Sequence, residues 1–100
     1  MLNVKRIRLL KQVKTDLDSG KRFYDDLEKG IGSYFYDSLI SDIESLTIYA
    51  GSHTRDFEYF KMNSKRFPYF IYYKVSKAFI TIVAVLDSRQ DPEAIERRLN

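Results

Sequence analysis

The sequence predicts an α+β fold in which an antiparallel pair of helices packs on a small, mainly antiparallel β-sheet. Apolar residues recur at intervals of three and four over residues 13–46 and alternate with a period of two over much of residues 57–86. Only a few residues connect the two helical segments, which favours antiparallel neighbours. A chain of 100 residues, 44% of them hydrophobic, suffices for one compact domain but not two. We therefore expect residues 1–100 to form a single domain.

The chain begins with a short predicted strand at residues 4–10, where Ile7 and Leu9 alternate with Arg6 and Arg8. A helix follows, with its apolar side made by Val13, Leu17, Phe23, Tyr24 and Leu27. Gly20 interrupts it, at a cost of roughly 1 kcal/mol relative to alanine. Gly30 stands where a left-handed cap would end this helix.

A second helix is predicted from a stripe at steps of four, four, four and three, made by Ile31, Phe35, Leu39, Ile43 and Leu46. The acids Asp37, Asp42 and Glu44 are expected off this stripe. More generally, we expect the acids of residues 16–44 to lie on the solvated sides of the two helices. Ala50 and Gly51 end the second helix.

The second half of the chain predicts three strands and a final helix. Residues 57–60 form the first strand, residues 67–75 the second, with Pro68 at its start, and residues 79–86 the third. The third strand is almost entirely apolar, which indicates a strand covered on both faces or central in the sheet. Asp91, Pro92 and Glu93 open a short C-terminal helix. The order is β-α-α-β-β-β-α, and the sheet face opposite the helix pair is expected to be open.

Charge is distributed unevenly along the chain, whose net charge is +3. Residues 61–86 contain five cations and no acid, whereas residues 12–50 contain eight acids and four cations. A polyanion such as nucleic acid, or an acidic protein partner, would explain the basic stretch. The alternative is that Lys65, Lys74 and Lys77 are solvated turn and edge residues, since edge lysines also prevent strands of different molecules from pairing.

The composition excludes several classes of protein. There is no cysteine, so a disulfide scaffold, a thiol nucleophile and a cysteine zinc site are absent. The basic start has an apolar run too short for a signal peptide, and residues 78–86 are about half of a membrane-spanning helix. We expect a soluble cytoplasmic protein with no membrane partner, no cofactor and no metal.

Three stretches resemble the RelE/ParE superfamily of toxins from bacterial type II toxin–antitoxin systems. The first is Asp16-Leu17 followed by Arg22-Phe23-Tyr24. The second is residues 65–73, KRFPYFIYY, and the third is residues 85–92, VLDSRQDP. The resemblance covers nearly the whole chain and implies a growth-inhibiting toxin neutralised by a cognate antitoxin. RelE-like members cut messenger RNA in the ribosomal A site, whereas ParE-like members inhibit DNA gyrase and are not nucleases.

The resemblance also implies the candidate site. Arg66 matches a phosphate-binding arginine and Arg89 the arginine after the last strand, with Lys61 and Lys65 nearby in sequence. Asp87 stands where the family has a histidine. The alternative for Arg66 and Arg89 is a structural pairing with Asp87 or Asp91.

Metal-free RNA cleavage needs a base, an acid and cations on the phosphate. An aspartate of ordinary pKa, about 3.9, is a poor base at neutral pH, and residues 96–100 lack the tyrosine of RelE-like members. His53 is expected to be an ordinary loop residue, and the tyrosines mainly core residues, with Tyr72 the best candidate to stack on a base. The sequence favours a ParE-like inhibitor that binds DNA gyrase. A RelE-like mRNA endoribonuclease remains the alternative, and the oligomeric state is open.

Overall fold

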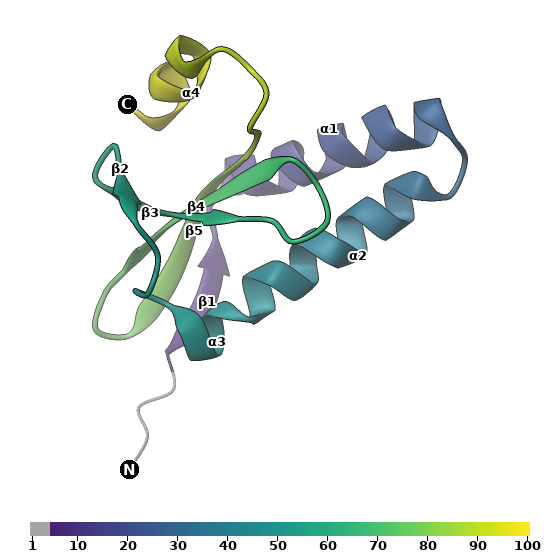
Figure 1. Ribbon diagram of the computed structural model, residues 1–100. Coiled ribbons are helices and arrows are strands. Elements are labelled where there is room, and N and C mark those ends of the chain that lie inside the picture. Colours follow the sequence, from purple (N-terminus) through teal and green to yellow (C-terminus); the bar gives the residue numbers. More distant parts are fainter. Residues whose placement is uncertain (1–4) are drawn as a thin grey trace.

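The computed structural model describes residues 5–100 and has the predicted α+β architecture (Figure 1). The elements are β1 (Arg6–Leu9), α1 (Lys11–Leu27), α2 (Ile31–Glu44), α3 (Leu46–Tyr49), β2 (Arg55–Asp56), β3 (Tyr59–Asn63), β4 (Tyr69–Val75), β5 (Phe79–Asp87) and α4 (Pro92–Leu99). The short α3 and β2 are additions to the predicted order. No helix in residues 5–100 is long and apolar enough to cross a membrane.

The strands form one sheet in the order β1-β5-β4-β3-β2. β1 pairs with β5 in parallel, and the other neighbours are antiparallel. β5 therefore lies inside the sheet, between β1 and β4, and is largely buried on both faces, as its apolar sequence predicts. The α+β class, the N-terminal strand and the C-terminal helix are confirmed.

The α1–α2 hairpin covers one face of the sheet and forms the larger part of the core (Figure 1). Phe35 and Leu39 of α2 are fully buried, as are Ile71 and Tyr73 of β4. Gly20 permits this packing, because a Cβ there would lie 2.5 Å from the Phe35 ring. Glycine at position 20 lowers the helix propensity of α1, but its lack of a side chain allows the two helices to pack closely.

A bulge in β5 changes which of its residues face each of the two cores. The register with β4 shifts between Tyr72 and Tyr73. As a result Val85 belongs to the core under the hairpin, whereas Val83 and Ala84 lie with the smaller core on the opposite face.

The prediction that this opposite face is open is wrong, because α4 covers part of it. Ile95 and Leu99 of α4 pack with Tyr72, Ala84 and Leu86. Tyr72 is only 1% exposed, so it cannot act as a stacking platform.

Asp16 of α1 links α4 to β5 through hydrogen bonds to both elements. Its Oδ2 accepts hydrogen bonds from Arg98 Nη2 (2.8 Å) and from the backbone N–H of Val85 (3.0 Å). The Asp16 side chain is 11% exposed. The prediction that the acids of residues 16–44 are all solvated is therefore wrong at this position, because the end of β5 needs an acceptor.

Two further details differ from the predictions. Phe57 and Glu58 have φ of +52° and +69° and form the tight turn between β2 and β3. The strand predicted at residues 57–60 is therefore wrong in its first two residues and begins at Tyr59. Gly30 has φ +96°, but it caps the start of α2 rather than the end of α1. Asp25 completes this corner by accepting from the backbone N–H groups of Gly30 and Gly32.

Candidate functional site

The loop of residues 64–68 and the segment 87–90 after β5 lie side by side at one end of the sheet. Tyr69 at the start of β4 pairs with Asp87 at the end of β5. The backbone N–H of Ser88 donates to the carbonyl of Pro68 at 2.8 Å. The fold thus brings together the basic strand start and the motif after the last strand, two stretches about twenty residues apart in sequence.

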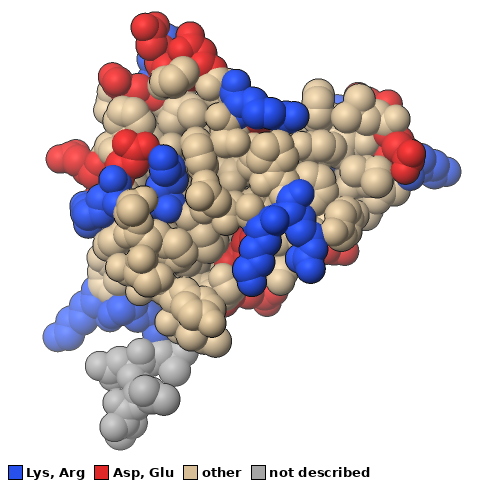
Figure 2. Space-filling view, viewed as in Figure 1, with Lys and Arg blue, Asp and Glu red and all other residues tan. Residues whose placement is uncertain are grey.

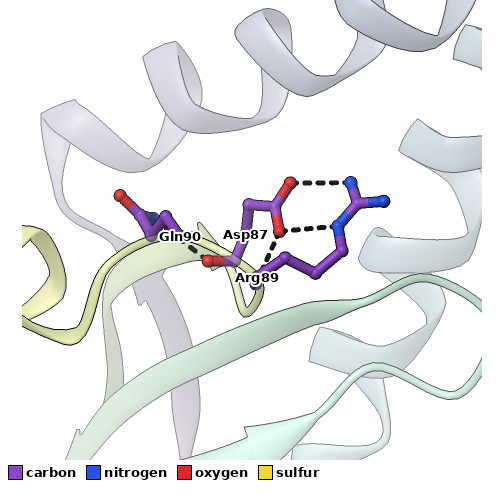
Figure 3. Close-up of polar contacts among 3 residues, drawn as sticks. All are labelled: Asp87, Arg89 and Gln90. Atoms are coloured by element: carbon purple, nitrogen blue, oxygen red, sulfur yellow. Dashed lines mark hydrogen bonds and ion pairs between the residues drawn. The ribbon is translucent and has the colours of Figure 1, made fainter.

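Arg89 forms a bidentate ion pair with Asp87 (Figure 3). Its Nε and Nη2 donate to the two carboxylate oxygens at 3.0 and 2.8 Å, and its backbone N–H donates to Oδ1 at 2.8 Å. The hydrogen bonds from Arg89 lower the pKa of Asp87, and Asp87 raises the pKa of Arg89. The pair is locally neutral, as the pairing alternative predicts.

Arg66 has a different environment from Arg89. It is exposed in the loop of residues 64–68. Within residues 5–100, neither its guanidinium nor the ammonium of Lys65 makes an ion pair or a side-chain hydrogen bond. Two adjacent cations are therefore available to a ligand at this loop.

The loop that carries them is fixed at three points. Asp42 of α2 accepts a hydrogen bond from Ser64 Oγ at 2.7 Å and from the backbone N–H of Lys65 at 3.3 Å. The Phe67 ring packs against Tyr24 and Phe35, with centroids 4.9 and 5.1 Å away. The Pro68 carbonyl accepts from Ser88, as described above. Arg66 thus projects from a loop anchored on both sides.

Asp42 is 4% exposed, and its prediction as a solvated acid is wrong. The sequence contains the signal, because Asp42 follows Leu39 by three residues and Phe35 by seven, which places it on the buried stripe. The anchoring role itself depends on a loop more than twenty residues away, so helical spacing alone could not reveal it.

Lys61 lies apart from Arg89, on the face covered by α4. Its ammonium is 3.5 Å from a carboxylate oxygen of Asp56 and 4.5 Å from the Phe70 ring centroid. It lines a groove of about 300 Å³ together with Tyr72, Gln90, Pro92 and other residues. Arg89, by contrast, lies on the hairpin side, where Tyr24 is close enough to contribute to the raised pKa of Arg89. The predicted site residues are thus divided between the two faces of the sheet.

The two candidates for proton transfer, Tyr69 and His53, have an unfavourable pKa or an unfavourable position. Burial, followed by the charge of Asp87, raises the pKa of Tyr69 to about 12, and its side chain is buried. His53 lies near the other end of β4, where its Nδ1 and the Tyr73 hydroxyl share a hydrogen bond of 2.5 Å. Burial lowers the pKa of His53. His53 is therefore a half-buried, hydrogen-bonded residue rather than a free loop residue.

The surface that includes the hairpin and the loop between β3 and β4 is mostly uncharged in the view of Figure 2. Lys and Arg side chains lie on it as separate groups, and Asp and Glu lie mainly toward its margins. The hairpin itself carries exposed aromatic rings, Phe23 of α1 (47% exposed) and Tyr34 of α2 (51%). The Tyr34 ring is 5.5 Å from that of Phe67, beside the cationic loop.

The fold is found in a solved structure described as the chromosomal ParDE TA system from P. aeruginosa. The TM-score is 0.77, with 13% sequence identity over 86% of this chain and 98% of that chain. No protein-family model matches the sequence, and no curated protein is similar to it. The fold implied by the resemblance to the RelE/ParE superfamily is thereby confirmed.

Proposed function

We propose that this chain is the toxin of a type II toxin–antitoxin system of the RelE/ParE superfamily and inhibits growth by binding DNA gyrase. The toxin assignment is supported by the shared fold together with the three sequence stretches that resemble the superfamily. Residues 1–100 act as a single toxin domain in the cytoplasm, with no cofactor and no metal.

The observation that carries the binding mechanism is the pairing of Asp87 with Arg89. Asp87 is the acid–base candidate in the motif, yet both of its oxygens accept hydrogen bonds from Arg89 and its pKa is lowered. A carboxylate held in this state is a weak general base at neutral pH. Tyr69, with its raised pKa, is a weak general acid. Binding therefore accounts for the site better than nuclease chemistry.

The cations of the patch then serve as contacts with a partner. Lys65 and Arg66 form its centre because their charges are unpaired within the described chain, and Arg89 contributes through the part of its guanidinium that Asp87 leaves free. Lys61 is a peripheral contact on the α4 side. An antitoxin that is partly disordered when free would fold on binding, with acids against Arg66 and apolar residues against the exposed rings of the hairpin.

An RelE-like messenger RNA endoribonuclease is the second candidate. The groove beside Lys61 favours it, since a cation above an aromatic floor is a setting in which a base and a phosphate can bind. Some metal-free nucleases rely on lysines and arginines in this way, which the resemblance also implies.

Controlled expression in a bacterial host tests the proposal. We expect growth to stop, an SOS reporter to be induced, and transcripts to remain intact. Coexpression of a small acidic protein from a neighbouring reading frame should restore growth. Arrest with transcripts cut in the ribosomal A site would replace the gyrase proposal by the nuclease. Normal growth with abundant folded protein would contradict the toxin assignment.

A further inference from the structure

We infer that Asp42 is a positioning residue for the cationic patch: its buried carboxylate holds the loop of residues 64–68 so that Lys65 and Arg66 are presented to the partner in one arrangement. The inference rests on the proposed function, because it assigns Asp42 to the same patch. Asp42 lies on α2, outside every sequence motif that points to the site.

The placement of Asp42 is unusual for a carboxylate. It is 4% exposed, and no side-chain nitrogen of a Lys, Arg or His in residues 5–100 lies within ion-pair distance. A buried charge without a cation is costly unless hydrogen bonds satisfy it. Here the donors are the hydroxyl of Ser64 and the backbone N–H of Lys65. The loop itself thus supplies the hydrogen bonds of the buried carboxylate. If the loop moved away, the Asp42 carboxylate would lose these bonds while still buried, which is energetically unfavourable.

The bonds fall at the start of the loop, where they matter most for Arg66. Phe67 and Pro68 already fix the other side through the aromatic cluster and the hydrogen bond from Ser88. Asn63 is held by its pairing with Phe70, and the Ser64 N–H donates to the Tyr69 carbonyl at 2.9 Å. Asp42 extends this anchoring to Lys65, the residue next to Arg66. A rigid loop presents its cations with less entropy to lose when a partner binds. A negative charge beneath Lys65 and Arg66 also reduces the repulsion between these neighbouring cations.

Asp25 offers a matched control on the neighbouring helix. Its carboxylate also accepts from two donors, the backbone N–H groups of Gly30 and Gly32, but it serves the turn between α1 and α2. Asp25→Asn should affect the stability of the hairpin without affecting the loop of residues 64–68. A comparison of Asp42→Asn with Asp25→Asn therefore separates loss of positioning from loss of stability.

The experiment measures amide hydrogen exchange of the loop and growth inhibition for the two variants. In Asp42→Asn we expect the Lys65 amide to exchange about tenfold faster, and the dose of protein needed for growth arrest to rise about three- to tenfold, the range expected for ordering one long side chain. Asp25→Asn should leave both values near wild type. Ser64→Ala removes the loop-side donor without touching α2 and should reproduce the Asp42→Asn effects in part.

The outcomes separate this inference from the proposed function. If Arg66→Ala abolishes growth arrest but Asp42→Asn and Ser64→Ala, both folded, inhibit like wild type, the positioning role is wrong and the patch stands. Equal losses in Asp42→Asn and Asp25→Asn at equal melting temperature would also overturn the positioning role. If Arg66→Ala itself inhibits like wild type, the patch proposal fails instead.

Discussion

Two neighbouring segments each carry an arginine, and the structure treats these arginines in opposite ways. Arg89, two residues after the end of β5, is neutralised by Asp87 through three hydrogen bonds. Arg66, in the adjoining loop, has no charged partner in residues 5–100 and projects from an anchored backbone. A cluster of cations in a sequence is therefore not yet a charged surface. What matters is which of the cations the fold leaves unpaired.

The largest effect is expected from Arg66→Ala. Removing an unpaired, preorganised guanidinium should weaken target inhibition by about tenfold or more, equivalent to about 1.4 kcal/mol. The melting temperature should stay within about 2 °C of wild type, since an exposed side chain contributes little to stability. Growth arrest measured against protein level checks the first expectation and thermal denaturation the second. Unchanged inhibition would remove Arg66 from the patch.

Arg89→Ala should have a smaller effect on function and a modest effect on stability. Because Asp87 occupies two of the guanidinium donors, we expect inhibition to weaken by about two- to fivefold, or about 0.5–1 kcal/mol. The lost ion pair is exposed on the Arg89 side, so the free energy of unfolding should fall only slightly. Denaturant titration and the same growth assay measure both. An effect larger than that of Arg66→Ala would reverse the comparison.

Asp87→Asn converts the paired segment into a second free cation. The account predicts that inhibition is kept or strengthened by up to about threefold, because Arg89 becomes available to an acidic partner. A nuclease that used Asp87 as its base would instead lose about a hundredfold or more. A dose series of the variant against wild type decides between the two results.

The smallest effect is a pH dependence confined to acid. The folded-state pKa of Asp87 is lowered, so its contribution to stability is present above its unfolded pKa, about 3.9, and is lost as the pH falls through the folded value. The difference in melting temperature between wild type and Asp87→Asn should therefore be constant above about pH 5 and shrink below pH 4. A difference that grows on acidification would contradict this assignment of the pair.

The sequence was most informative where one periodicity decides the structure. The stripe from Ile31 to Leu46 and the apolar strand ending at Leu86 correctly predict the hairpin and a strand covered on both faces, because burial of a whole face tolerates few alternatives. The turn at Phe57 and Glu58 was missed, since both residues are poor turn formers and only the pairing of β2 with β3 imposes their positive φ.

The sequence predicted which residues belong to the candidate site but not how they interact. Sequence motifs identify Arg66, Arg89 and Asp87, but which arginine pairs with the acid depends on side-chain geometry within a few ångströms. Asp16 and Asp42 were misplaced for a related reason. From sequence alone, a carboxylate on a helix is predicted to be solvated. The donors to Asp16 are Val85 and Arg98, and those to Asp42 are Ser64 and Lys65. All of them are distant in sequence, so only the fold reveals them.

The most direct test of the account uses one preparation of the purified protein in two assays, with Arg66→Ala as the matched control. The first assay is DNA supercoiling by gyrase, and the second is cleavage of messenger RNA on ribosomes with a programmed A site. We predict that the wild-type protein inhibits supercoiling, that Arg66→Ala does so at least about tenfold less well, and that the messenger RNA stays intact. Cleavage of the messenger RNA by the wild-type protein, with gyrase unaffected, would contradict the central claim that the patch acts by binding.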